Sequence, residues 1–274
     1  MRPPAASRGR NVRPPRGGGR FYPDSPRALM TAIDRYLDAA AAPGLAASPA
    51  LIAPHAGYVY SGPIAGSAFA VWREVDPPVR RIVLLGPNHY VPVRGIALPE
   101  ASAFATPLGT VPVAADLVAE LCSLPGVRID AAAHAPEHSL EVELPFLQRL
   151  LGEVEIVPLL VGEAAPAEVA AVLRVAWNDP GTRVVVSSDL SHFLPYEEAR
   201  RVDQVTAEQI RAGGERLTPF QACGARAING LLFEAARRGL TAELRDLRNS
   251  GDTAGSRDQV VGYGAFVFTG EADA

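Results

Sequence analysis

The sequence predicts a single α/β domain with a largely parallel central sheet covered by helices on both faces. Apolar segments alternate with amphipathic ones along almost the whole chain. The apolar segments are nearly continuous in Val, Ile and Leu, which is typical of strands that are buried on both faces. The chain has 274 residues, no internal repeat and no interior linker, so one domain is the better count.

The expected elements follow one another in a regular order. Helices are predicted over 25–40, 63–74, 114–124, 136–151, 166–177, 196–212 and 219–238, strands over 50–54, 81–86, 154–161, 183–188 and 260–268, and a hairpin-like stretch over 95–113. In the segment 136–151, leucines recur at the helical period, at Leu140, Leu144, Leu147 and Leu151. Pro145 falls inside this segment, so we expect it to kink or split the helix.

Composition excludes several classes of protein. With 48% hydrophobic and 20% charged residues and a net charge of −4, the chain is expected to fold around a sizeable core and to bind neither nucleic acid nor an anionic membrane. No segment reaches the length needed to span a bilayer, and no apolar stretch typical of a signal peptide follows the N-terminus. We therefore expect a cytoplasmic protein.

The N-terminal segment differs from the rest of the chain. Residues 1–12 are rich in Arg, Pro and Gly, so we expect a disordered tail, followed by the folded domain over 13–274. A nucleic-acid-binding arm is the less favoured interpretation, because no aromatic residue is interleaved to stack on bases.

Three of the five histidines follow predicted strands directly. His55, His89 and His192 each come just after an apolar segment, and ligands of α/β sheets bind outside the carboxyl ends of the strands. Alone, each histidine is more often a structural hydrogen-bonding group. Together, His55 and His89 are the start of a two-histidine metal site.

Asp189 and His192 form a second unit, three residues apart. The carboxylate of Asp189 either orients the His192 ring and fixes its tautomer, or caps the following segment. His192 fits a general acid/base or an additional metal ligand, and the spacing leaves both open.

A further pair, His134 and His138, has helical metal-site spacing, but Pro136 favours a first helical turn and leaves His134 outside the helix. His138 is then free to point into the crevice. Glu141, on the same expected helical face as His138, is a candidate acceptor for its ring, and Glu143 is expected on a solvated face.

Of the two cysteines, Cys223 is the more informative. Thr218 and Gln221 read as a capping box, which places Cys223 in the second turn of a helix, where the dipole favours thiolate. In a crevice with two imidazoles this thiolate would be a soft metal ligand; without them, a buried inert cysteine is the better interpretation. Cys122 is expected to pack in the core.

Several motifs together carry a family resemblance. They are APHAGYVYSGPIAG (53–66), LGPNHY (85–90), TPLGTVPV (106–113), EHSLEVELPFLQ (137–148), SSDLSH (187–192) and VVGYGAF (260–266). In this order they resemble the Memo family, whose prokaryotic members are also called AmmeMemoRadiSam system protein B. The match runs from about Val12 to the last predicted strand.

The resemblance implies a fold similar to that of the class III extradiol dioxygenases, which hold non-haem Fe(II) with two histidines and a carboxylate. His55 and His89 match the two histidines, and Cys223 stands where the dioxygenases have the carboxylate. His192, with Asp189 beside it, matches the acid/base histidine, and His138 matches another histidine of the pocket.

The leading hypothesis is therefore a mononuclear metal-binding, dioxygenase-like redox protein. His55, His89 and Cys223 would bind Fe(II) or copper, His192, Asp189 and His138 would act on an unknown small molecule, and a radical-SAM protein is the partner that the family name implies. One alternative is a zinc-type hydrolase with the same ligands. The other is a non-catalytic binding or signalling protein that recognises a peptide with a relic pocket.

Overall fold

The computed structural model describes residues 11–40, 48–73, 78–214 and 216–270. The α-helices are α1 (Pro26–Ala39), α2 (Tyr58–Phe69), α3 (Ala115–Leu121), α4 (Ala131–His134), α5 (Leu144–Leu151), α6 (Pro166–Ala176), α7 (Tyr196–Arg211) and α8 (Ala225–Arg238). Short 3₁₀ turns are η1 (Ala70–Trp72), η2 (Glu141–Glu143) and η3 (Ser250–Asp252). Of these described helices, none has both the length and the apolar composition to cross a membrane.

The strands form one large and one small sheet. They are β1 (Val12–Arg13), β2 (Ala50–Ala53), β3 (Arg81–Pro87), β4 (Ile96–Leu98), β5 (Ala103–Thr106), β6 (Gly109–Pro112), β7 (Val127–Ile129), β8 (Glu155–Val161), β9 (Thr182–Ser187), β10 (His192–Leu194), β11 (Thr241–Asn249) and β12 (Val260–Thr269). The large sheet has the order β10-β12-β2-β9-β3-β8-β4-β7, with β11 paired to β12, and the small sheet has the order β1-β5-β6.

The prediction of a single α/β domain is confirmed, but the sheet is mixed rather than largely parallel. Only its centre, β2-β9-β3-β8, is a continuous parallel block. On one side β12 runs antiparallel to β2, and on the other β4 runs antiparallel to β8. The chain reaches β12 through the β11–β12 hairpin and reaches β4 from β3 without a helix, so neither strand follows a crossover helix that would make it parallel.

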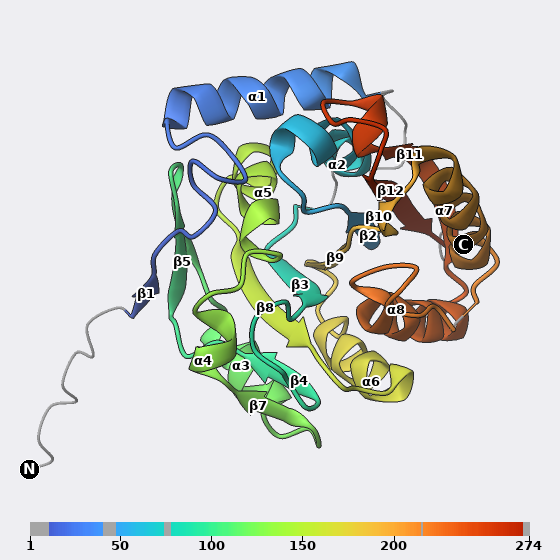
Figure 1. Ribbon diagram of the computed structural model, residues 1–274. Helices are drawn as coiled ribbons and strands as arrows, with labels where there is room; N and C mark the ends of the chain where they lie inside the picture. The colour runs from blue at the N-terminus through green and yellow to red at the C-terminus, as the bar shows by residue number, and fades with distance from the viewer. Residues whose placement is uncertain (1–10, 41–47, 74–77, 215, 271–274) are drawn as a thin grey trace, which may run out of the picture.

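Helices cover both faces of the sheet, as expected (Figure 1). Alternate residues of the central strands divide between two apolar cores: Leu84 of β3 belongs to the core under α1, α2 and α5, whereas Val83 and Leu85 belong to the core under α3, α6, α7 and α8. This division explains the near-continuous apolar strands, because both faces of each strand must be apolar.

Local sequence explains the start of α1 and its close approach to α2. Ser25 caps α1 by accepting a hydrogen bond from the Ala28 N–H, and Pro26 occupies the first helical turn. Where α2 crosses Tyr36, a Cβ at Gly66 would lie 2.6 Å from the Tyr36 carbonyl oxygen. Only glycine at this position allows the two helices to pack so closely.

Two predicted helices begin later than expected. The segment 136–151 splits as Pro145 suggested, into the turn η2 and the helix α5. The helix predicted from 219 begins only at Ala225. The Gln221 and Ala222 N–H groups close a turn on the Thr218 carbonyl, and the Cys223 N–H donates outside the segment, to the Asp189 carbonyl.

The strand β11 is not predicted from the sequence, since its residues are too rich in charges to indicate a strand.

The first ten residues lie outside the described part of the chain, and the segment that follows them is anchored to the domain by Glu141. This carboxylate is 0% exposed, pairs with the buried guanidinium of Arg13 and accepts hydrogen bonds from the Arg16 N–H, the Gly17 N–H and the Tyr22 hydroxyl. The sequence predicts that Glu141 accepts a hydrogen bond from the His138 ring. This prediction is wrong, because η2 is not a regular α-helical turn and Glu141 binds the N-terminal segment instead.

Replacing Glu141 by Ala should leave the Arg13 guanidinium buried without its partner. We expect the free energy of unfolding to fall by about 3–5 kcal/mol, and trypsin to cleave at Arg16 or Arg20 before the rest of the domain. Urea unfolding and limited proteolysis measure both effects. As a control, Glu155→Ala removes an exposed partner of Arg81 and should cost less than about 1 kcal/mol. Equal stability of the two variants would show that Glu141 does not anchor the segment.

Candidate metal centre

The carboxyl ends of three central strands lie side by side and carry the predicted site residues. Ala53 of β2 is in register with Ser187 of β9, and Leu85 of β3 with Val186 of β9. His55, His89 and Asp189 each follow two residues after the end of their strand. The parallel block thus delivers these side chains to one edge of the sheet.

Three imidazoles meet at this edge. His55, His89 and His138 each offer a ring nitrogen, and these three nitrogens lie within 4.8 Å of one another. The ring centroids are 5.2 Å apart for His55 and His89, 5.7 Å for His55 and His138, and 4.8 Å for His89 and His138. We call these three residues the histidine cluster.

Glu137 fixes the orientation of His89. Its Oε1 lies 2.9 Å from the His89 Nδ1, and its Oε2 accepts the His89 backbone N–H at 2.6 Å. Burial opposes ionisation of Glu137, but the hydrogen bonds that it accepts from His89 and Ser139 outweigh burial and lower the pKa of Glu137 to about 2. An ionised acceptor at Nδ1 fixes the Nδ1–H tautomer and leaves Nε2 as the ligand atom.

His55 is the most enclosed member of the cluster, with 1% of its surface exposed. Its Nδ1 lies 2.8 Å from the Ser187 hydroxyl, and its backbone N–H donates to Asp189 Oδ1 at 2.8 Å. Burial, together with the neighbouring His89, lowers the pKa of His55 to about 3. The ring is therefore neutral at physiological pH, the form that binds metals.

His138 completes the cluster from the segment before α5. Its ring stacks on Phe21 at a centroid distance of 4.2 Å, and its Nδ1 lies 3.2 Å from the Tyr90 hydroxyl. Burial lowers the pKa of His138 to about 4, so this ring is neutral as well. Phe21 reaches it because Glu141 holds the N-terminal segment in place.

Cys223 lies beside the cluster but contacts only one of its members. Its Sγ is 3.5 Å from the His55 Nε2 and accepts the Asp189 N–H at 3.2 Å. The residue occupies the turn before α8 and not the second helical turn predicted from sequence. Desolvation of the sulfur and the nearby charge of Asp189 raise the pKa of the thiol, opposite to the expected effect of a helix dipole.

Asp189 and His192 lie close to this edge without bonding each other. Asp189 Oδ1 accepts the backbone N–H groups of His55 and Ala56, so it caps the turn after β2. His192 Nδ1 lies 2.8 Å from the Leu190 carbonyl, which makes Nδ1 the protonated nitrogen and leaves Nε2 as an acceptor. His134 stays apart: it is buried, with Nε2 2.9 Å from the Ala97 carbonyl.

Sequence reasoning assigned no role to two residues that orient the cluster, Glu137 and Ser187. Glu137 was visible as an acid directly before His138, but its partner His89 is distant in sequence. Glu143, expected in solvent, is fully buried beside Ser187. The wrong placement of Glu143 follows from treating 137–143 as a regular helix.

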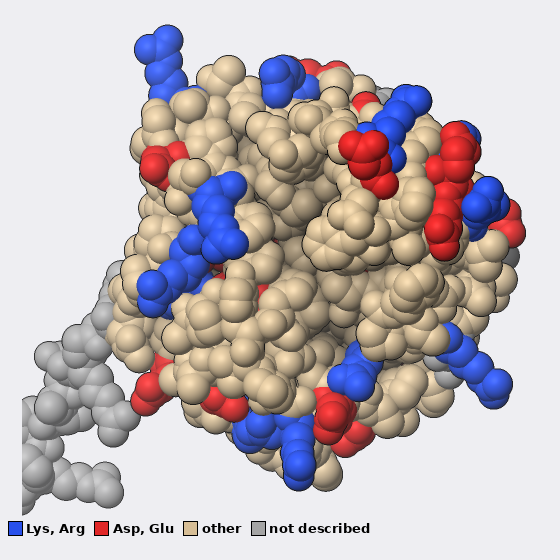
Figure 2. Space-filling view, in the orientation of Figure 1, with Lys and Arg blue, Asp and Glu red and all other residues tan. Residues whose placement is uncertain are grey.

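Figure 2 shows a hollow at the centre of one face, over the area where α2, β3 and β10 meet in Figure 1. Charged side chains gather around its rim rather than inside it. His55 precedes α2, His89 follows β3, and His192 begins β10. The hollow is therefore bordered by the segments that carry the candidate site.

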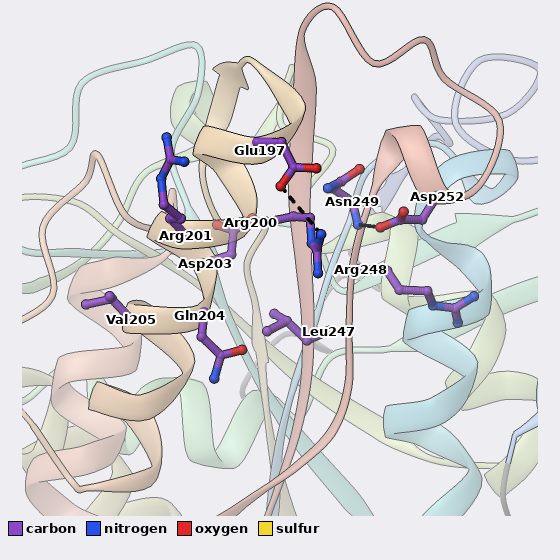
Figure 3. Close-up of a pocket in the computed structure, with 10 residues that line it drawn as sticks. All are labelled: Glu197, Arg200, Arg201, Asp203, Gln204, Val205, Leu247, Arg248, Asn249 and Asp252. Atoms are coloured by element: carbon purple, nitrogen blue, oxygen red, sulfur yellow. Dashed lines mark hydrogen bonds and ion pairs between the residues drawn. The ribbon is translucent and has the colours of Figure 1, made fainter.

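A separate cavity of about 580 Å³ lies between α7 and β11 (Figure 3). Among its charged residues, Glu197 pairs with Arg200, and Arg248 pairs with Asp246 outside the lining. Asp203 lines it and accepts the Ser191 N–H, and burial raises the pKa of Asp203 to about 6. None of the six predicted site residues lines this cavity.

Comparison with known proteins identifies relatives along nearly the full chain. A MEMO1 family protein of Archaeoglobus fulgidus is 38% identical over 94% of this chain and 99% of its own length. MEMO1 family proteins of Aquifex aeolicus and Methanopyrus kandleri are 34% and 33% identical, over 94% and 93% of this chain and 99% and 98% of their own lengths.

Among solved structures, an uncharacterized protein of Escherichia coli K12 aligns with a TM-score of 0.47 and 16% identity, over 79% of this chain and 99% of that one. The family model described as Memo-like protein matches residues 13–267. With this match and relatives above 30% identity over more than nine-tenths of its length, the chain belongs to the Memo-like family.

Proposed function

We propose that this protein binds one transition-metal ion at the histidine cluster and uses it for redox chemistry on a small molecule. The observation that carries the proposal is the convergence of three ring nitrogens within 4.8 Å. Two of the rings, His55 and His89, have Nδ1 occupied by Ser187 and Glu137, so that Nε2 is left for an ion. Such outer hydrogen bonds are the usual support of histidine ligands.

His55 and His89 are the two ligands we assign to the ion. His138 is the third according to the present geometry, and Cys223 becomes the third if the turn before α8 moves its sulfur toward the ion. A thiolate beside imidazoles suits copper or iron, so we propose Fe(II) first and copper second.

The remaining residues of the crevice would handle protons and orientation. A bound iron or copper ion would supply an open coordination position and one-electron chemistry. His192, locked with its proton on Nδ1, presents Nε2 as the group that takes a proton from substrate. Asp189 holds the His55 backbone in place, and the Tyr90 hydroxyl restrains His138.

A zinc-type hydrolase is the second candidate, and His138 is the observation that favours it. Three imidazoles with an open fourth position are a known ligand set of catalytic zinc. In that case a metal-bound water would be the nucleophile, and Cys223 would not be a ligand.

Replacing His55 by Ala should abolish stoichiometric metal binding, because His55 belongs to both ligand sets. Protein purified without oxygen should hold about one iron or copper ion per chain, measured by mass spectrometry. Cys223→Ser and His138→Ala then identify the third ligand, since the variant that lacks it should lose at least tenfold in affinity. His134→Ala, which removes a histidine outside the cluster, is the control.

Retention of zinc alone, with Cys223→Ser unaffected, would support the hydrolase instead. A wild-type chain that binds no metal but captures a peptide would contradict both candidates.

Replacing Glu137 by Gln should weaken metal binding by about 10–100-fold, although Glu137 is not a ligand. The amide keeps the shape of the side chain but loses the charge that holds the His89 Nδ1–H. Titration calorimetry with the metal-free protein measures the change. Glu120→Gln, at an exposed position of α3, is the matched control. If both variants bind metal equally well, Glu137 does not support the site.

A further inference from the structure

Glu143 is a buried acid that forms no ion pair in the described residues and is not a proposed metal ligand. It is 0% exposed, and no arginine or histidine pairs with it in the described part of the chain. Its Oε1 lies 2.8 Å from the Ser187 hydroxyl, and its Oε2 has no hydrogen-bond partner there. A buried carboxylate without a cation is strongly destabilised, whereas a buried carboxylic acid is not.

A second buried carboxylate, Asp189, adds to the cost of ionising Glu143. Asp189 accepts two backbone N–H groups, from His55 and Ala56, which stabilise its charged form. Burial raises the pKa of Glu143 well above its ordinary value; the Ser187 hydrogen bond opposes this shift, and Asp189 adds to it. The other titratable neighbour, Tyr58, donates its hydroxyl proton to the Val142 carbonyl and not to Glu143.

The hydrogen bonds of the Ser187 hydroxyl indicate independently that Glu143 is protonated. The Ser187 Oγ has three neighbours: the His55 Nδ1 at 2.8 Å, the Ser139 carbonyl at 2.7 Å and Glu143. A hydroxyl has one proton to donate, and the Ser139 carbonyl can only accept it. Ser187 must then accept from both His55 and Glu143, and Glu143 can donate only as the neutral acid.

We propose that Glu143 is a neutral carboxylic acid and a positioning residue, which directs the Ser187 hydroxyl toward Ser139 and thereby fixes the Nδ1–H tautomer of His55. Metal affinity depends on it because this tautomer presents Nε2 to the cluster. That consequence rests on the proposed metal function; the protonation state of Glu143 does not.

Infrared difference spectroscopy on the metal-free full-length protein tests the protonation state. The wild type should show the carbonyl stretch of a protonated carboxylic acid at pH 7.5 that Glu143→Gln removes and Ser187→Ala shifts. Glu234→Gln is the control, because Glu234 is equally buried but pairs with Arg174, Arg237 and Arg238 and is ionised. A spectrum without any band that depends on Glu143 would overturn the proposal.

Variants at the same position test the positioning role. Glu143→Leu keeps the site apolar but donates no hydrogen bond, so we expect nitrogen-15 NMR to show both His55 tautomers and zinc affinity to fall about tenfold. Glu143→Gln, which donates through its amide, should restore the single tautomer and most of the affinity. Equal behaviour of Gln and Leu in the NMR spectrum would overturn the proposal. A wild type that binds no zinc, iron or copper contradicts the metal function alone, since both spectroscopic tests use metal-free protein.

Discussion

The buried Asp189 is the group on which the candidate site depends, because it joins three segments that are far apart in sequence. Its Oδ1 accepts the N–H groups of His55 and Ala56, its carbonyl accepts the Cys223 N–H, and its own N–H points at the Cys223 sulfur. It follows β9 directly, so the centre of the sheet fixes its position. The turn after β2 and the turn before α8 are thus held at one place by a single residue.

Desolvation then sets the charge of two histidines near this residue. His55 and His138 are neutral, since burial lowers the pKa of each to about 3 and about 4. The protonation states of the two acids differ because their hydrogen bonds differ. Glu137 accepts four N–H groups and is ionised, whereas Glu143 contacts one hydroxyl and is neutral. The neutral rings of His55 and His138 suit a cation, because neither has to lose a proton before it binds one.

The sequence predicts the parts of this site that local patterns encode. His55 and His89 follow apolar strands, and the rule for strand ends brings them together without knowledge of the whole fold. The position of Cys223 was predicted wrongly because a long-range hydrogen bond to Asp189 replaces the next helical one. The roles of Glu141 and Glu143 were missed because the 3₁₀ turn η2 rotates them away from their α-helical directions. The strand β12 is predicted from its sequence, but its antiparallel direction is not, since a buried strand has the same apolar pattern in either direction.

In the proposed function, the identity of the ion depends on which of two neighbours of His55 is the third ligand. With His138 as third ligand, the ion would be held by three imidazoles, as zinc is in some hydrolytic sites. With Cys223, the thiol must first lose a proton that burial and the charge of Asp189 make it retain. Only an ion with a strong preference for sulfur can displace that proton. In the proposed function, Asp189 therefore organises the crevice and also disfavours ions that bind thiolate weakly.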